Sequence, residues 1–571
     1  MAGIRSPSGS RRWSAVVLCI VAGIAATGAK PPLRDAPVAW HEDDRRDIPA
    51  PKPRDLNRVH VTMDASFFRP LGRLFHPGRF VRRVGTIFGG DHVPPAANLN
   101  TLDEVPNSSW FTNRIGLFPT TPEEAARGPM TGPGPDRSGK WTVVGAKTEG
   151  VSPGFTIEDI KGDVYAIKFD PPGYLGTTTA AGVISGRILH TAGYNVPEDG
   201  IVTFRREQLV LGDDVEFTLP DGTERLMTRR DLDSILQQVE PLPDGTWRAL
   251  ASKWLDGVDM GPFDWKGRRK DDPNDQVRHE NRRELRGLRM FAAWLCHFDT
   301  KQENTVDFYV EEDGRRFLRH YLLDFASTLG AGALGPFPTA CWEYSWDFLV
   351  VFGRAMALGL YEDHWRRVER PPGLDEIGYF QGEIFHPMAF KPTEPNTAFA
   401  NLTDRDGYWA AKIISAFSDE HLEAVVAEGR YRNPAAARWI VRALGERRDT
   451  LARYWFDRVA PLDFFTYEGG MLRFRDLGAE RGIYPGSVPQ YRVRVAATTP
   501  QRSRGTQSDW VTTTEPAVDL ERAGGDQLGT HAPQDYPFLA AELQVSRGGR
   551  WSSSLTVYVA RGSGRVVELE R

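Results

Sequence analysis

Residues 297–304, with the sequence His-Phe-Asp-Thr-Lys-Gln-Glu-Asn, constrain this chain of 571 residues more than any other segment. Asp299 and Asn304 follow a stretch, 281–294, whose apolar residues recur at helical spacing. A carboxylate in such a loop can orient a hydroxyl group or accept its proton, and an amide oxygen suits a hard cation such as Mg²⁺. Alone, the same two residues can equally cap and brace a loop, so their interpretation depends on what accompanies them.

Two further segments flank this loop in a fixed order. Upstream, Val-Tyr-Ala-Ile-Lys predicts a strand that ends at Lys168. Downstream, Tyr-Leu-Leu-Asp-Phe-Ala predicts a buried strand end, where the charge of Asp324 needs a partner. Asp324 lies 25 residues after Asp299 (324 − 299), and a hairpin predicted over 305–323 accommodates that length. Lys168 alone would be a surface lysine and Asp324 a turn former, but the ordered set predicts that both converge with Asp299 in one cleft.

Together these segments resemble the protein-kinase-like superfamily, over about residues 140–470. In this resemblance H-x-D-x-x-x-x-N matches the catalytic loop, Val-Tyr-Ala-Ile-Lys matches the strand with the phosphate-binding lysine, and Asp-Phe-Ala matches D-F-G. Within the superfamily the chain is similar to divergent bacterial members, such as HipA-like and CotH-like kinases, and to the secreted casein kinases of animals. It is also similar to a group of secreted bacterial proteins that share Lys-Phe-Asp-Pro-Pro, here residues 168–172.

The resemblance also implies cofactors and roles. The expected cofactors are ATP and either Mg²⁺ or Mn²⁺. Asp299 is then the catalytic base, and Lys301 lies near the γ-phosphate. Lys168 binds the α- and β-phosphates, while Asn304 and Asp324 hold the metal ion.

The turn before Lys168 departs from the kinase pattern. No G-x-G-x-x-G precedes this lysine, and a glycine-bearing turn over 145–154 stands in its place. Backbone N–H groups of such a turn can still wrap a phosphate. Glu149 and Gly150 in this turn are therefore the further candidate cofactor-binding residues.

The helix after Lys168 and the catalytic loop depart from the pattern as well. A helix predicted over 178–192 lacks the glutamate that would pair with Lys168, and Gly182 stands at its position. Glu149 is the alternative partner. Phe298 replaces the arginine of H-R-D, which argues against control by phosphorylation of an activation loop.

The fold class we expect is α+β: a bilobal, protein-kinase-like fold with an N-terminal extension and a small C-terminal β module. The first residues carry Arg5, Arg11 and Arg12 before the apolar run 15–26, which is typical of a secretory signal peptide cleaved near Ala29. No later segment is apolar enough to span a membrane. The predicted units are a signal peptide (1–29), the N-terminal extension (30–138), a β-rich N-lobe (139–255), a helical C-lobe (256–480) and the C-terminal β module (485–571).

The composition limits the classes of partner and metal site that we expect for this chain. The net charge of −5 gives no reason to expect nucleic acid. The histidines are scattered, without the Cys/His spacing of a zinc site. Beyond Cys19, in the apolar leader run, only Cys296 and Cys341 remain, and two cysteines do not make a disulfide scaffold for a chain of this size. We expect both as buried free thiols, with pairing in an oxidising compartment as the alternative.

The function we expect is that of an exported kinase-like enzyme, periplasmic or extracellular. It would transfer phosphate from ATP to a hydroxyl group of a protein, peptide or sugar. The alternative is a pseudokinase that serves as a nucleotide-binding or scaffold module in the cell envelope. A third idea is other nucleotide chemistry, such as AMP transfer.

Overall fold

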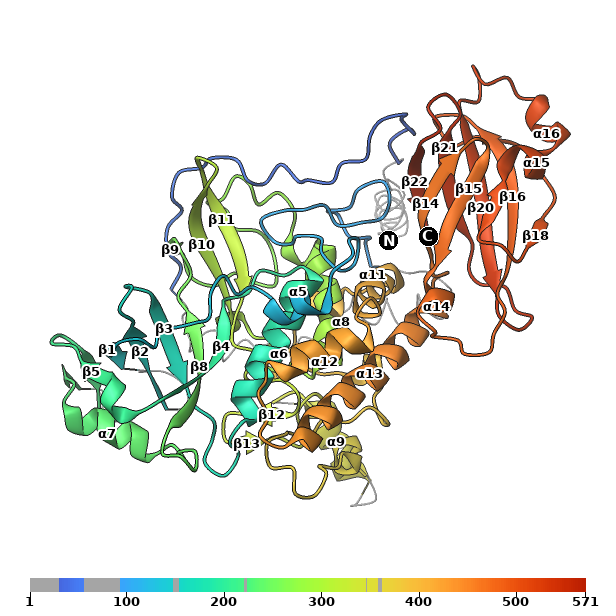
Figure 1. Cartoon of the computed structure of the whole chain (residues 1–571). Helices are drawn as coiled ribbons and strands as arrows, with labels where there is room; N and C mark the ends of the chain where they lie inside the picture. Colours follow the sequence, from blue (N-terminus) through green and yellow to red (C-terminus); the bar gives the residue numbers. More distant parts are fainter. Residues whose placement is uncertain (1–29, 56–92, 147–152, 220–222, 346, 358–361) are drawn as a thin grey trace, which may run out of the picture.

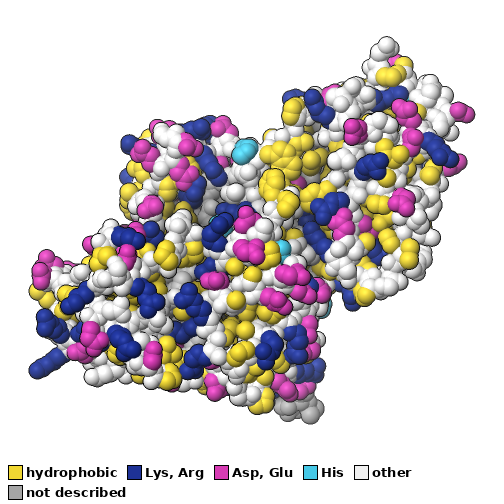
Figure 2. All heavy atoms as spheres, viewed as in Figure 1, with side chains coloured by type: hydrophobic (Ala, Val, Ile, Leu, Met, Phe, Trp, Pro, Cys, Tyr) yellow, Lys and Arg dark blue, Asp and Glu magenta, His cyan; other side chains and the backbone are white. Residues whose placement is uncertain are grey.

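The computed structural model describes residues 30–55, 93–146, 153–219, 223–345, 347–357 and 362–571. Over these residues the fold mixes α and β structure: a β sheet stands at one end, helices fill the middle, and further sheets stand at the other end (Figure 1). Basic and acidic side chains are interspersed over the face seen in Figure 2. The predicted signal peptide (1–29), together with Glu149 and Gly150, lies outside the described residues.

The first sheet has six strands in the order β4-β8-β3-β2-β1-β5, all antiparallel to their neighbours except the β1–β5 pair. In β3 alternation buries Tyr165 and Ile167 on one face, where helix α7 packs, and therefore places Lys168 on the opposite face. The bounds are β1 Trp141–Ala146, β2 Gly154–Glu158, β3 Val164–Lys168, β4 Asp199–Phe204, β5 Leu209–Leu211, β8 Trp247–Lys253 and α7 Arg229–Gln237, with the short hairpin β6 Glu216–Thr218 and β7 Glu224–Leu226 beside them.

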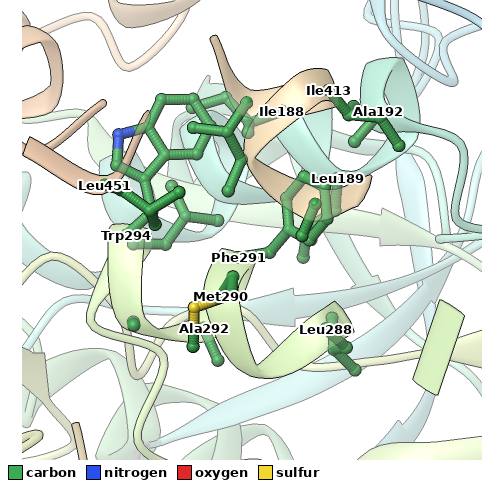
Figure 3. Close-up of a cluster of buried hydrophobic side chains, with 14 of the residues drawn as sticks. Ile188, Leu189, Ala192, Leu288, Met290, Phe291, Ala292, Trp294, Ile413 and Leu451 are labelled. Carbon is green, nitrogen blue, oxygen red and sulfur yellow. The ribbon is translucent and has the colours of Figure 1, made fainter. Parts of the chain in front are cut away.

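The helical core is the largest hydrophobic cluster of the described residues. Helix α6 (Thr177–Ala192) is buried along its whole length except at His190, and α8 (Arg283–Leu295) is buried nearly as fully. Figure 3 shows Ile188 and Leu189 of α6 facing Phe291 and Trp294 of α8. The other helices of this region are α5 Pro122–Arg127, α9 Phe348–Met356, α10 Thr397–Ala400, α11 Asp404–Ile414, α12 Asp419–Ala427 and α13 Pro434–Phe456.

Two small sheets adjoin the helical core. β10 (Thr305–Glu312) and β11 (Arg315–Leu322) form the predicted hairpin, which turns at Asp313 and Gly314, and β9 (Val258–Asp259) pairs with its edge. β12 (Ala331–Gly332) and β13 (Gly335–Pro336) form a minimal hairpin after Asp324.

The C-terminal strands form two further sheets with a core of their own, built largely from alternating apolar residues. β14 and β15 belong to this core although they precede residue 485, because β15 pairs with β19 far along the chain. The helical lobe predicted to extend to residue 480 thus includes two strands that pack with the β module. The bounds are β14 Leu462–Glu468, β15 Met471–Asp476, α14 Leu477–Glu480, β16 Gln490–Thr498, β17 Arg504–Gln507, β18 Val511–Thr513, β19 Ala517–Asp519, α15 Leu520–Gly524, α16 Asp526–Gly529, β20 Phe538–Ser546, β21 Leu555–Ala560 and β22 Val566–Glu570.

The N-terminal extension packs against the other regions. Leu33 packs on the apolar face of β20–β22, and Ile48 packs with Met260 and Leu318 near the β10–β11 hairpin. Trp110 is buried, with its ring stacked 3.5 Å from that of His320. In Figure 1 the first described segment (dark blue) runs from the C-terminal sheets to the β9–β11 sheet. Within the described residues no helix is both long enough and apolar enough to span a membrane.

Candidate functional site

Lys168 reaches across from the first sheet to the segment after β11. It is the last residue of β3, and its Nζ lies 3.3 Å from Oδ1 of Asp324. Both side chains keep partial access to solvent, at 28% and 41% of their surface. Lys168 and Asp324 are 156 positions apart in the sequence (324 − 168), yet their side chains form an ion pair that remains partly accessible to solvent.

Asp324 owes its position to an abrupt end of β11. The strand stops at Leu322, and Asp324 adopts a left-handed backbone with φ of 56°. Asp tolerates this region better than most residues, and such backbone often marks functional turns. The N–H of Leu323 donates to the carbonyl of Asn304 at 2.9 Å, so the turn that carries Asp324 is tied to the loop that carries Asn304.

Asp299, Lys301 and Asn304 form one polar cluster in that loop. Nδ2 of Asn304 donates to the backbone carbonyl of Asp299 at 2.7 Å and to its Oδ2 at 3.0 Å. Nζ of Lys301 lies 3.4 Å from Oδ1 of Asp299. Burial alone would lower the pKa of Lys301, but Asp299 and Glu303 outweigh it and raise that pKa. Because the amide nitrogen of Asn304 is engaged by Asp299, its amide oxygen is the atom that it can offer to a cation.

His297 interacts with both the loop that carries Asp299 and the segment that carries Asp324. It is buried, its ring lies 5.7 Å from that of Phe325, and its imidazole interacts electrostatically with both Asp299 and Asp324. Burial lowers its pKa despite those two carboxylates. The lowered pKa favours the neutral imidazole, and the ring packs against Phe325.

Helix α6 offers Lys168 no carboxylate. A Cβ on Gly182 would stand 3.4 Å from Leu250 and 3.7 Å from the backbone nitrogen of Ala326, so the helix packs directly on the sheet and on the segment after Asp324. At the start of α6, Asp170 accepts hydrogen bonds from the backbone N–H groups of Gly176, Thr178 and Thr179. Asp170, from the Lys-Phe-Asp-Pro-Pro pattern, thus orders the chain between Lys168 and the helix.

Asp199 is an acid near the site that sequence reasoning missed. It begins β4, is buried, and interacts electrostatically with Lys168 and Asp324. Burial raises its pKa to about 6, against the opposing influence of Ser252 and Lys168. In the sequence it reads as part of the turn Pro-Glu-Asp-Gly before a strand, and nothing local signals its place beside Lys168.

A small cavity lies beside the Lys168–Asp324 pair. It is lined by Lys168, Thr178, Thr179, Asp324, Ser327 and Ala333. Among the residues that the structure describes, no group of three or more His, Cys, Asp or Glu side chains is placed to hold a metal ion. Asn304 and Asp324 therefore fit only a cation that takes most of its ligands from water or a bound phosphate, as Mg²⁺ commonly does.

The two cysteines flank this site and form a disulfide, with their Cα atoms 5.7 Å apart. The expectation of free buried thiols was wrong, because the chain after Asp324 folds back and brings Cys341 against Cys296 at the end of α8. Cys296 directly precedes His297. The bond therefore ties the segment after Asp324 to the start of the loop that carries Asp299.

Comparisons with known proteins identify no family for this chain. No family model matches it, and no curated protein matches it. One solved structure that aligns with it is a Helicobacter pylori proinflammatory kinase, CtkA, at 11% sequence identity and a TM-score of 0.29. The alignment covers 55% of this chain and 94% of the other.

Proposed function

We propose that the chain is a kinase-like phosphotransferase, with a bilobal arrangement of the first sheet and the helical core around a nucleotide cleft. The observation that carries the proposal is the meeting of Lys168 with Asp324, next to the Asp299–Asn304 cluster. Phosphoryl transfer needs a cation on the phosphates, oxygen ligands for a metal ion and a carboxylate at the acceptor hydroxyl. These groups come from three separate segments: Lys168 pairs with Asp324, and a backbone hydrogen bond from Leu323 to Asn304 ties the Asp324 turn to the Asp299 loop.

Each residue has a distinct role in this proposal. Lys168 binds the α- and β-phosphates of ATP. Asn304 and Asp324 hold Mg²⁺ or Mn²⁺, which neutralises charge on the phosphates when bound. Asp299 orients the acceptor hydroxyl and takes its proton as the new O–P bond forms and the bond between phosphorus and the ADP oxygen breaks. Lys301 stabilises Asp299 and approaches the γ-phosphate.

The acceptor in this proposal is a hydroxyl group of a protein, peptide or sugar. The predicted signal peptide, residues 1–29, supports a reaction in the periplasm or outside the cell, without nucleic acid as a partner. A nucleotide-binding scaffold is the second candidate function. It is favoured by Gly182, which leaves Lys168 without the usual helix carboxylate. AMP transfer is a third outcome that the same cleft can support.

Thermal unfolding with nucleotide tests the proposal. We expect ATP with Mn²⁺ to raise the midpoint of the wild type by several degrees, and Asp324→Ala to lose this shift while keeping its ligand-free midpoint. Incubation with γ-labelled ATP and, separately, α-labelled ATP then distinguishes phosphate transfer from AMP transfer. Binding without transfer of either label would favour the scaffold, and no shift with any nucleotide would refute nucleotide binding.

A further inference from the structure

A buried carboxylate lies behind Lys168 on the same face of the first sheet. Asp199 of β4 pairs with Ser252 of β8, and Ser252 pairs in turn with Ala166 of β3. Residues directly opposite each other share a face of a sheet, and so do residues two apart on one strand. Asp199 and Lys168 therefore both project toward α6. The strand order β4-β8-β3 can be followed in Figure 1.

Helix α6 leaves the space that Asp199 fills. A Cβ on Gly186 would stand 3.3 Å from the ring of Phe325 and 3.9 Å from Oδ2 of Asp199. A longer side chain from the helix would collide with both. Because Phe325 directly follows Asp324, the Asp199 carboxylate lies beside the segment that carries the proposed metal ligand.

Ser252 forms a hydrogen bond with Asp199, but the rest of the surroundings supply little compensation for the charge of this carboxylate. The side chain is 5% exposed, and its Oδ1 has no hydrogen-bond partner among the described residues. Its charged neighbours are Lys168, Arg187 and Asp324. Both Nη atoms of Arg187 are engaged elsewhere, since Nη1 donates to the Arg127 carbonyl at 2.9 Å and Nη2 pairs with Glu428 at 3.1 Å. Lys168 is thus the cation left to face a carboxylate whose burial would otherwise be costly.

We propose, on the basis of the proposed function, that Asp199 is the positioning residue for Lys168. In the structure Lys168 pairs with Asp324. When the oxygens of Asp324 turn to a metal ion, Lys168 loses part of that pairing. Asp199 then supplies the negative charge that holds the ammonium group in the cleft. A strand aspartate thereby replaces the helix glutamate that Gly182 leaves absent.

A double-mutant cycle on the full chain tests this assignment. The measured quantity is the affinity for a non-hydrolysable ATP analogue with Mn²⁺, by isothermal titration calorimetry. Asp199→Asn keeps the shape and removes the charge, and we expect it to weaken binding about 5- to 50-fold in the wild type. In a Lys168→Met background we expect it to change nothing further. The ligand-free melting temperature of Asp199→Asn should equal or exceed that of the wild type.

A matched control is Asp163→Asn, which removes a carboxylate beside the same sheet that pairs with Lys253 at 3.0 Å and should leave affinity unchanged. Equal weakening by Asp199→Asn in both backgrounds would show a merely structural role, and unchanged affinity in the wild type would likewise overturn the assignment. Absence of any binding by the wild type would overturn the proposed function and this inference together. Wild-type binding with additive mutations would overturn the inference alone.

Discussion

Lys168 and Asp324 form an ion pair, with Nζ 3.3 Å from Oδ1, between the last residue of β3 and the turn after β11. The pair joins the first sheet to the segment that continues into the helical core. An exposed or half-exposed pair of this kind contributes little to stability. Its importance lies in placing an ammonium and a carboxylate where the Asp299 loop also arrives.

Asp299→Asn should separate chemistry from binding. The amide keeps the size of the side chain but cannot take a proton, so we expect phosphate transfer to fall about 100- to 10,000-fold. Nucleotide affinity should change far less, because the amide that replaces the carboxylate keeps an oxygen that can accept the hydrogen bond from Nδ2 of Asn304. Initial rates with γ-labelled ATP measure the first effect and calorimetry the second. Undiminished transfer would remove Asp299 from the proposed mechanism.

The pH dependence of stability should reveal Asp199. Its pKa is raised by burial to about 6 in the folded protein, against 3.8 for the ordinary group. The folded state therefore binds a proton more tightly than the unfolded state, so the contribution is fully present below about pH 4 and is lost as pH rises through 6. Asp199→Asn removes this loss, worth about 2–3 kcal/mol at pH 8. Melting curves at pH 4 and pH 8 should show the mutant gaining on the wild type only at pH 8. An equal difference between mutant and wild-type melting temperatures at both pH values would contradict a raised pKa for Asp199.

Reduction of the Cys296–Cys341 bond should destabilise the protein. The bond closes a loop with a sequence separation of 45, for which loop-closure entropy predicts about 3–4 kcal/mol. Urea denaturation with and without dithiothreitol measures the effect. The Cys296→Ser, Cys341→Ser double mutant serves as the control, since it should match the reduced wild type and ignore the reductant. A reductant effect that persists in the double mutant would mean that it acts elsewhere.

Trp110→Ala should show that the N-terminal extension is part of the helical core. Trp110 is 4% exposed, and the guanidinium of Arg282 lies 4.8 Å from the centre of its ring. Loss of so large a buried ring typically costs about 3–5 kcal/mol. Trp254→Ala, at a position that is 61% exposed, is the matched control and should change stability by less than about 0.5 kcal/mol. Denaturant midpoints followed by circular dichroism compare the two, and equal midpoints would refute the packing argument.

Local patterns sufficed for most elements near the site. The strand predicted to end at Lys168 and the helix predicted over 178–192 are confirmed as β3 and α6. Boundaries were less secure where capping decides them. The sequence predicts a helix over 408–416, and in the structure this helix, α11, begins earlier, at Asp404, because Thr403 and Asp406 form a capping box.

Local sequence patterns did not predict the features that depend on contacts between distant segments of the chain. The pairing of Cys296 with Cys341 depends on how the chain folds back after Asp324. The place of Asp199 depends on the register of β4 against β8. The membership of β14 and β15 in the C-terminal core depends on β19. Each of these three features depends on a partner far away in the sequence, and the local spacing of apolar residues carries no information about such a partner.

The described N-terminal segment, residues 30–55, links two distant parts of the molecule. The N–H of Leu33 donates to the carbonyl of Pro500 at one end, and the N–H of Ile48 donates to the carbonyl of Arg316 at the other. Fifteen positions of chain (48 − 33) therefore link the C-terminal sheets to the β10–β11 hairpin beside the loop that carries Asp299. Proteolysis between these two anchors would cut no strand of any sheet, and the C-terminal sheets would stay attached to the helical core through contacts such as the Lys412–Asp463 ion pair at 3.1 Å.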